Sequence, residues 1–132
     1  MMNGGCFCGA IRYRVPDKVF HATNCHCDIC RRTTGAPCVA WFSVAAADFA
    51  LLAGTPASFR SSAHATRTFC PRCGTQLTFA DDASPAEIDI TTCSLDQPSL
   101  VPPQDHTFVG RKLAWMILAD GLPQFRRSRA EG

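Results

Sequence analysis

The chain has 132 residues, of which 46% are apolar and 18% charged, so it can bury a core of its own and is too apolar for extensive disorder. Its formal net charge of +2 is too small to indicate a polyanionic partner such as a nucleic acid. The longest apolar stretch, residues 44–53, contains Asp48 and is too short to cross a bilayer.

Short apolar segments bounded by turn residues predict β-strands along most of the chain. Residues 12–15 and 87–91 alternate polar and apolar side chains, as half-buried strands do. Helix signals are weak: we expect one turn at residues 28–32, capped by Asp28 and ended by Gly35, and another at 45–48. The expected strands are residues 10–15, 19–24, 38–44, 49–53, 57–61, 66–69, 76–79 and 87–94.

The last third of the sequence is expected to be rich in loops, since four prolines fall between residues 98 and 123. We expect one mainly-β domain over residues 1–125 and a basic tail over residues 126–132. The tail carries Arg126, Arg127 and Arg129. A solvated tail explains this cluster better than a nucleic-acid contact does.

Seven of the nine cysteines fall into three tight clusters, at residues 6–8, 25–30 and 70–73. Thiolates one or two residues apart converge on one point, which suits a soft divalent ion, whereas a disulfide between near neighbours closes a strained ring. The first residues lack a basic start followed by an apolar core, so no secretory signal is expected. A cysteine-rich chain of this kind is expected in the reducing cytoplasm, where thiols bind metal instead of pairing.

Two of the clusters together predict a closed metal site. Four thiolates complete a tetrahedral shell around one ion, and they come from Cys6, Cys8, Cys70 and Cys73. Gly74 follows directly and favours a tight turn that directs backbone N–H groups at the sulfurs. Buried free cysteines are the alternative, but they do not usually occur as CxC and CxxC pairs before a turn glycine.

The remaining cluster is one ligand short. Cys25, Cys27 and Cys30 can all reach one ion, but the segment supplies no fourth ligand. The fourth position is either open for water or an incoming thiol, or closed by a distant residue such as His64 or His106. The spacing alone does not decide between an open and a closed site.

Residues near the clusters have two interpretations each. Arg31 and Arg32 follow the third thiolate of the second cluster, so they could bind the carboxylates of an anionic substrate. Alternatively, they offset the negative charge of the thiolates or face water. Cys38 and Cys93 lie in apolar strand patterns, and core packing is expected for both rather than reactivity.

The three cysteine motifs together resemble the glutathione-dependent formaldehyde-activating enzyme family, whose other well-known branch is the centromere protein V group. The motifs are GCFCG at residues 5–9, CHCDICRR at 25–32 and FCPRCGT at 69–75, and they occur in the order typical of the family. Residues 94–96, 112–115 and 120–123 follow the same pattern, so the resemblance runs from about residue 3 to about residue 125.

This resemblance implies an Mss4-like fold, in which several short, coiled antiparallel β-sheets are pinned by zinc and little helix is present. It implies two zinc ions per chain, a structural ion on the four-cysteine set and a catalytic ion, with an exchangeable fourth position, on Cys25, Cys27 and Cys30. Whether the second site is fully or partly occupied is left open. The residues expected to contact substrate are Arg31, Arg32, His106 and Lys112.

The activity implied by the resemblance is that of a carbon–sulfur lyase acting on a thiol–aldehyde adduct. In the family's named reaction, glutathione and formaldehyde combine to S-hydroxymethylglutathione. An open zinc position would bind the thiol as thiolate, which would attack the aldehyde carbon. The expected partners are therefore a small thiol and an aldehyde, without nucleic acid or membrane, and a homodimer is left open.

Two other functions compete with this interpretation. The basic tail and the centromeric relatives would suit a non-catalytic zinc module that binds a protein or nucleic acid, although the low net charge argues against it. A methionine sulfoxide reductase on the same fold, using Cys93, would carry an Arg-Tyr-Cys signature that this chain lacks.

Overall fold

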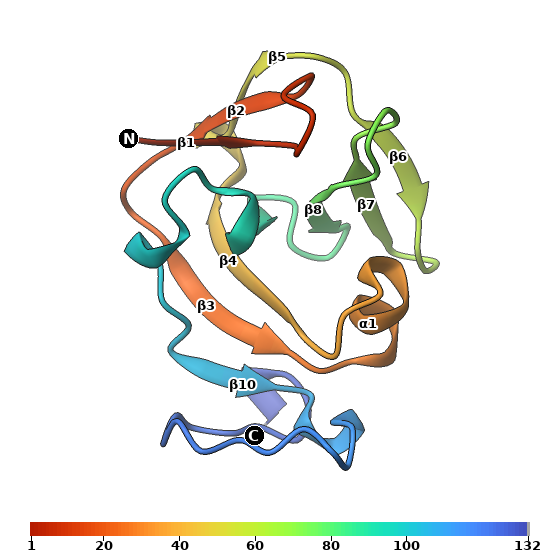
Figure 1. Ribbon diagram of the computed structural model, residues 1–132, viewed down its shortest axis with the longest axis vertical. Coiled ribbons are helices and arrows are strands. Elements are labelled where there is room, and N and C mark those ends of the chain that lie inside the picture. Colours follow the sequence, from red (N-terminus) through yellow and green to blue (C-terminus); the bar gives the residue numbers. More distant parts are fainter. Residues whose placement is uncertain (132) are drawn as a thin grey trace.

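The computed structural model describes residues 1–131 and is mainly β, with two sheets and one short helix, as predicted (Figure 1). The smaller sheet has the strand order β1-β2-β5 and is antiparallel. Its strands are β1 (Met2–Gly5), β2 (Arg12–Val15) and β5 (Ala50–Ala53). No helix in residues 1–131 has both the length and the apolar character needed to span a membrane.

The larger sheet has seven strands in the order β10-β3-β4-β9-β8-β7-β6. All of its neighbouring strands are antiparallel except β10 and β3, which are parallel. Its strands are β3 (Phe20–Cys25), β4 (Val39–Ala45), β6 (Ala57–Arg60), β7 (Ala65–Phe69), β8 (Gln76–Asp81), β9 (Glu87–Thr91) and β10 (Asp105–Thr107).

Every strand expected from the sequence is present, but two strands were missed. β1 has the sequence MNGG and β10 the sequence DHT, so neither carries the apolar alternation that predicts a strand. β10 also makes the one parallel pair of the described sheets, which the expectation of antiparallel sheets did not include. A parallel pair needs a long crossover connection between its strands. Here the connection between β3 and β10 contains all the strands from β4 to β9.

The helix α1 (Asp28–Thr34) confirms the helical turn predicted at residues 28–32. Gly35 ends it in the left-handed conformation, with φ of 69°, and donates its backbone N–H to the carbonyl of Arg31. The N-cap is Cys27 instead of Asp28, because the Cys27 sulfur accepts the backbone N–H of Cys30. A cysteine of the cluster therefore also starts the helix.

The two faces of the larger sheet bury different sets of side chains. Because side chains alternate along a strand, neighbouring residues of β4 point to opposite faces. Phe42 packs with Tyr13 of the smaller sheet and Ile90 of β9 in the main hydrophobic core. Trp41 belongs to a second, smaller cluster with Cys25 and other residues of the second cysteine motif.

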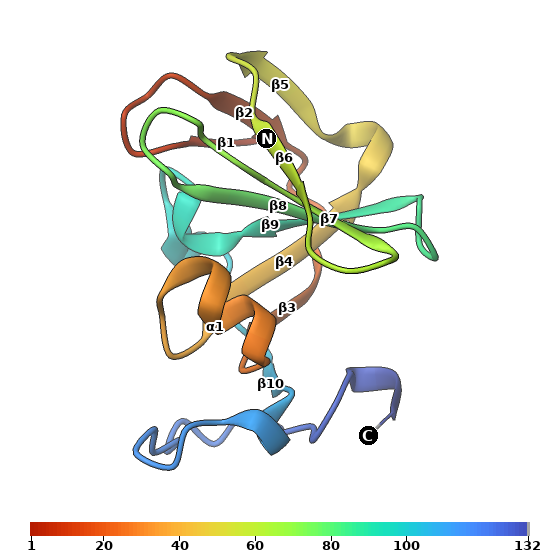
Figure 2. The same cartoon turned by 90° about the vertical axis from the view of Figure 1, so that its right-hand side faces the viewer.

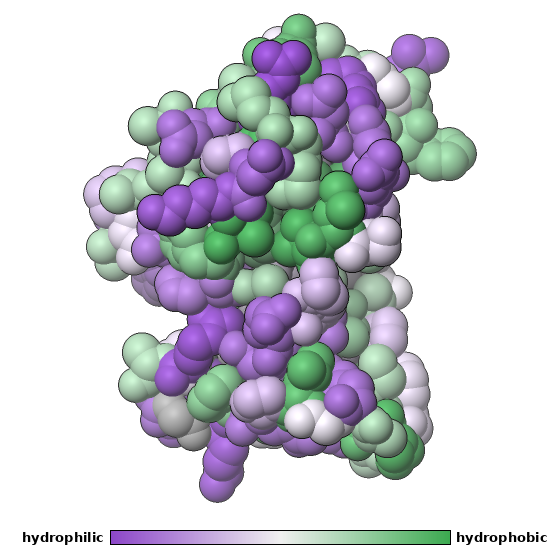
Figure 3. Space-filling model, turned by 90° about the vertical axis from the view of Figure 1, so that its left-hand side faces the viewer, coloured by the Kyte–Doolittle hydropathy of each residue, from purple (hydrophilic) through white to green (hydrophobic). Residues whose placement is uncertain are grey.

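The C-terminal segment, which is the chain that follows β10, lies at the end of the molecule opposite β1, β2 and β5 (Figure 2). Figure 3 shows, from another side, a constriction between the main body and this lower end. The Arg129 guanidinium donates to the buried Asp105 carboxylate at 2.6 and 3.0 Å, and the backbone N–H of Phe108 donates to the carbonyl of Arg127. The division into a domain of residues 1–125 and a tail stays a prediction.

We expect Phe42→Ala to lower the free energy of unfolding by about 3–5 kcal/mol, because it leaves a cavity in the main core. Phe42 is 0% exposed, whereas Phe7 is 93% exposed, so Phe7→Ala serves as the matched control and should change it by about 0.5 kcal/mol or less. Urea denaturation of metal-loaded protein measures both. Equal effects of the two substitutions would show that Phe42 is not part of the core that holds the sheets together.

Candidate metal centres and cavity

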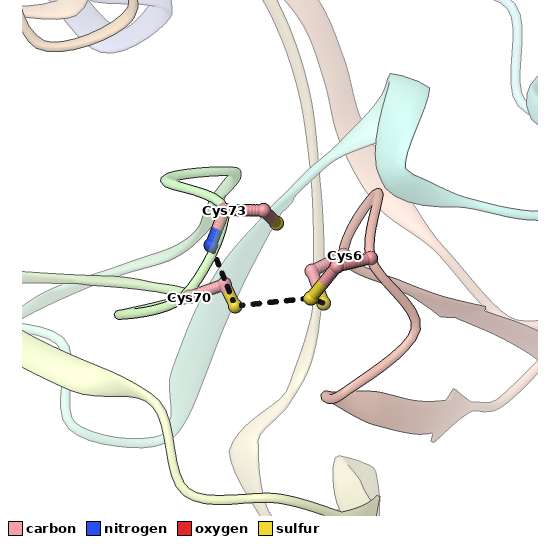
Figure 4. A group of neighbouring side chains, drawn as sticks. Cys6, Cys70 and Cys73 are labelled. Carbon is pink, nitrogen blue, oxygen red and sulfur yellow. Dashed lines mark hydrogen bonds between the residues drawn. The ribbon is translucent and has the colours of Figure 1, made fainter.

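Four cysteine sulfurs meet where two hairpin turns face each other. Cys6 and Cys8 lie in the turn between β1 and β2, and Cys70 and Cys73 lie in the turn between β7 and β8. All four sulfurs lie within 4.8 Å of one another. Figure 4 shows the two turns with their sulfurs directed at a common point. The structure therefore brings together the set that the sequence predicted.

The spacing of these sulfurs suits a tetrahedral ion. A Zn–S bond of about 2.3 Å places two sulfurs of a tetrahedron about 3.8 Å apart. The Sγ atoms of Cys6 and Cys8 are 3.5 Å apart and those of Cys8 and Cys70 are 3.8 Å apart. A disulfide would require about 2.05 Å, and all nine cysteines are free. The donor set and its geometry fit a divalent metal ion.

Backbone N–H groups support the thiolate form of this set. Ile11 donates to the Cys6 sulfur at 3.2 Å, and Cys73 donates to the Cys70 sulfur at 3.4 Å. Gly74, with φ of 83°, makes the tight turn after Cys73, as the sequence indicated. Hydrogen bonds of this kind orient thiolate ligands and stabilise their charge.

Three further sulfurs gather where β3 ends and α1 begins. Figure 1 shows the short connection between these two elements. Cys25 is the last residue of β3, Cys27 caps the helix and Cys30 lies buried in its first turn. Their sulfurs all lie within 4.8 Å of one another, which also suits a single ion. Within residues 1–131, no fourth His, Cys, Asp or Glu joins this group.

Hydrogen bonding within this three-cysteine group concentrates negative charge. The pKa of Cys27 is lowered to about 2, first because the Cys25 thiol donates to its sulfur and then because the Cys30 thiol does. The hydrogen bonds of Cys25 to Cys27 and to Cys30, together with burial, raise the pKa of Cys25. The group can therefore stabilise a thiolate where α1 begins.

Arg67 of β7 contacts this group, although the sequence analysis did not select it. Its Nη1 and Nη2 atoms lie 3.8 and 3.7 Å from the Cys30 sulfur. The side chain is 4% exposed, and its guanidinium lies over the Phe79 ring, 4.9 Å from the centroid. The only signal in the sequence is that an arginine stands in β7 at a position where the alternation of threonines with Ala65 and Phe69 predicts an apolar side chain.

A cavity of about 440 Å³ opens beside the three-cysteine group. Its floor is one face of the larger sheet. The lining residues of each strand are two positions apart, as Trp41 and Ser43 are on β4, so their side chains point to the same face. Strand pairing joins them in a row, in which Ser43 of β4 pairs with Asp89 of β9, Asp89 with Phe79 of β8, and Phe79 with Arg67. The thiol group lies at one end and a polar region at the other.

The polar region contains a mostly buried carboxylate. Asp89 accepts a hydrogen bond from the Ser43 hydroxyl at 2.6 Å. Burial raises its pKa, and that effect outweighs the hydrogen bond from Ser43. His21, Glu87 and Arg129 also line this part of the cavity. The alternating sequence of β9 predicted a half-buried strand, but it could not show that the polar side faces a cavity.

His26 and His106 link the three-cysteine group to the C-terminal segment. His26 Nε2 lies 3.0 Å from His106 Nδ1, and His106 Nε2 lies 2.7 Å from the Asp120 carboxylate. Both histidines are almost fully buried. Since the carboxylate accepts, a neutral His106 donates through Nε2 and accepts from His26. His106 does not line the cavity, and the backbone N–H of His26, between Cys25 and Cys27, donates to the carbonyl of Thr107 at 3.0 Å.

The other predicted substrate contacts also lie away from the cavity. Arg31 pairs with Asp28 at 2.7 Å, and both Arg31 and Arg32 line a separate surface groove with Trp115. The Lys112 ammonium donates to the carbonyl of Met116 at 2.7 Å. The roles of these residues in binding stay predictions.

The two cysteines outside the clusters were both expected in the core. Cys38 is half-buried, and burial raises its pKa. Cys93 is exposed, so its assignment to the core is wrong. It lies in the 3₁₀ turn Thr92–Ser94, where the strand pattern of residues 87–91 no longer continues.

Comparison with known proteins gives one family. A family model described as the glutathione-dependent formaldehyde-activating enzyme matches residues 1–111, which include both cysteine groups. A protein of Halomonas elongata, provisionally named a glutathione-dependent formaldehyde-activating enzyme, is 28% identical over 125 residues, which are 88% of this chain and 80% of that protein.

A solved structure is also similar to this chain. The crystal structure of a Rhodobacter sphaeroides protein superposes with a TM-score of 0.60, at 21% sequence identity. The match covers 94% of this chain and 99% of that one. At this identity, the likeness shows that the two proteins share a fold.

We expect two divalent ions per chain, one for each cysteine group, and single substitutions should remove them separately. Cys8→Ser and Cys27→Ser should each lower the content to about one ion per chain by elemental analysis. Cys8→Ser should also lower the melting temperature more, because its ion joins two turns that are distant in sequence. Cys93→Ser is the control and should keep both ions. Two ions retained in Cys8→Ser would contradict the four-sulfur site.

We expect Asp89→Asn to stabilise the protein at pH 7.5. The raised pKa means that ionisation of Asp89 destabilises the folded state as pH rises through the folded-state pKa. Asparagine removes the charge and still accepts from Ser43. The gain should shrink as pH falls toward the unfolded-state value near 4.

Denaturant unfolding at pH 7.5 and at pH 5.5 measures this gain, with the exposed Asp48→Asn as a control that should change neither value. Equal or lower stability of Asp89→Asn at pH 7.5 would contradict the raised pKa.

Proposed function

The chain belongs to the glutathione-dependent formaldehyde-activating enzyme family, and we propose that it is a zinc-dependent carbon–sulfur lyase that forms or cleaves a thiol–aldehyde adduct. The proposed substrates are glutathione, or a related small thiol, and formaldehyde or a related aldehyde. The family model spans the segments that carry all seven clustered cysteines, which supports the proposal.

The observation that carries this proposal is the position of the three-cysteine group at the wall of a cavity. Cys25, Cys27 and Cys30 all line the cavity, whereas none of the four-cysteine set does. A closed four-ligand site is typical of structural zinc, and three protein ligands are typical of catalytic zinc. We therefore assign a structural ion to Cys6, Cys8, Cys70 and Cys73, and a catalytic ion to the other group.

When bound by the three cysteines, zinc would supply a coordination position for the sulfur of a substrate thiol and would favour its thiolate form. The cavity volume of about 440 Å³ lies in the range usual for small-molecule sites. Trp41 and Phe79 form apolar walls beside the sulfurs, where the thiol and the aldehyde would meet.

The reaction itself needs little rearrangement. The thiol loses its proton to solvent, and its sulfur attacks the aldehyde carbon. A carbon–sulfur bond forms as the carbonyl π bond breaks, and the electron pair moves to oxygen, which takes a proton from water. The reverse sequence cleaves the adduct. Orientation of the two reactants in the cavity is the main contribution of the protein.

The setting of the enzyme is also a proposal. The free thiols require a reducing compartment, and we propose the cytoplasm. A homodimer is compatible with this function, which needs only the cavity of one chain.

We expect the wild-type protein to accelerate adduct formation from glutathione and formaldehyde, and Cys27→Ser to lower kcat/KM by at least 10²-fold. Loss of the proposed catalytic ion removes the binding position for the thiol, while the four-cysteine ion keeps the fold. NMR magnetisation exchange between free glutathione and the adduct measures the rate without a coupled assay.

Cys93→Ser is the control and should keep the wild-type rate. Wild-type protein with both ions that does not accelerate the exchange for glutathione or for other small thiols would contradict the enzyme assignment. It would leave a non-catalytic zinc module as the better description.

A further inference from the structure

Arg67 is the one arginine of the described chain that is buried at the wall of the cavity next to the three-cysteine group. In residues 1–131, no carboxylate lies within ion-pair distance of its guanidinium. A buried cation without an acidic partner is costly, so a group of opposite charge is expected beside it in the working protein. As a ligand of a metal ion, the Cys30 sulfur would supply part of that charge.

The hydrogen bonds of Arg67 leave donors unused. A guanidinium has five N–H groups. Nε donates to the Ser61 hydroxyl at 3.1 Å, and Nη1 and Nη2 each direct one N–H at the Cys30 sulfur, at 3.8 and 3.7 Å. Each terminal nitrogen therefore has a second N–H that is not engaged by Cys30. Because Arg67 lines the cavity, a ligand in the cavity can accept from them.

The packing of Arg67 fixes the direction of these donors. The guanidinium lies 4.9 Å from the centroid of the Phe79 ring and 5.8 Å from that of Trp41. Stacking on aromatic faces and the bond to Ser61 hold the planar group in one orientation. Donors that are fixed before the reaction stabilise developing charge without further reorganisation, and they are stronger in a site that excludes water.

We propose that Arg67 is a catalytic residue that donates hydrogen bonds to the aldehyde oxygen and stabilises the alkoxide formed when the thiolate adds to the carbonyl carbon. This inference rests on the proposed function, in which the thiolate sulfur is held at the three-cysteine group. The contact to Cys30 places the guanidinium beside the group that would hold the substrate sulfur. As the carbon–sulfur bond forms, the π electron pair moves to oxygen opposite Arg67, and water then protonates the alkoxide.

Arg67 would activate the aldehyde, which a metal ion on three thiolates polarises only weakly. A divalent ion with three cysteinate ligands is a poor Lewis acid toward a carbonyl. A guanidinium offers its positive charge together with directed hydrogen-bond donors. The adduct hydroxyl would then lie on Arg67, and the site would distinguish an adduct from a plain thioether.

The test compares Arg67→Met, Arg67→Lys and the control Arg14→Met, which changes an exposed arginine of the smaller sheet. In Arg67→Met, kcat for adduct formation should fall on the order of 10²–10³-fold, as when one oxyanion donor is removed. Two ions per chain and the affinity for glutathione should be retained. Arg67→Lys keeps the charge and a donor, so it should recover at least tenfold over Arg67→Met. Arg14→Met should match wild type.

A binding measurement tests the same contact without turnover. In calorimetric titrations, wild type should bind S-hydroxymethylglutathione, kept formed by excess formaldehyde, at least tenfold more tightly than S-ethylglutathione, because only the adduct has a hydroxyl on the carbon next to sulfur, where Arg67 would donate. In Arg67→Met this preference should fall to about threefold or less.

The inference is overturned if Arg67→Met keeps kcat within threefold of an active wild type, or if Arg67→Lys is no better than Arg67→Met. It is also overturned if Arg67→Met loses the second ion together with glutathione affinity, because Arg67 would then act by holding the cysteine group. A wild-type protein that holds both ions and does not catalyse the reaction would overturn the proposed function as well, which separates the two failures.

Discussion

Convergence of seven thiol groups at two points is the constraint on which the rest of this structure depends. Thiolates repel each other at separations below 4.8 Å, so their grouping is stable only with a cation that balances the charge. In a small domain, the free energy of metal binding is then part of the free energy of folding. The four-cysteine group joins the turn after β1 to the turn after β7, and it thereby fixes the smaller sheet against the larger one.

The alternation of side chains along the strands places the core residues on one face of the larger sheet and the cavity residues on the other. On β4, Phe42 and Val44 enter the core shared with the smaller sheet, while Trp41 and Ser43 face the cavity. The cavity face contains groups that a core would exclude, namely the buried Arg67 and the mostly buried Asp89, whose pKa is raised by burial. Groups that are costly to the fold and lie together in a cavity are typical of functional sites, and the three-cysteine group lies at the end of this cavity.

The sequence was sufficient to predict the features that depend on short-range spacing. The cysteine motifs indicated both metal groups, and the apolar segments indicated eight of the strands and the position of α1. β1 and β10 were missed, because a Gly-rich and a fully polar strand form only through pairing with distant partners. Arg67 and Asp89 were missed for the same reason: only the pairing of β7, β8 and β9 places them on the face that carries Cys25. Conversely, Arg31 and Arg32 are adjacent to Cys30 in sequence, but the helix directs them to another surface.

The central claim is that the three-cysteine group leaves a position for the sulfur of an external thiol. X-ray absorption at the zinc edge of the two-ion protein measures this most directly, because it gives the mean number of sulfur neighbours at about 2.3 Å per zinc. Without thiol, the account predicts the average of a four-sulfur and a three-sulfur site, which is three and a half. Addition of glutathione should raise the number to four. It should also remove the contribution of the lighter atom, such as the oxygen of water, that takes the fourth position without thiol. An unchanged number with glutathione bound in excess would contradict the account.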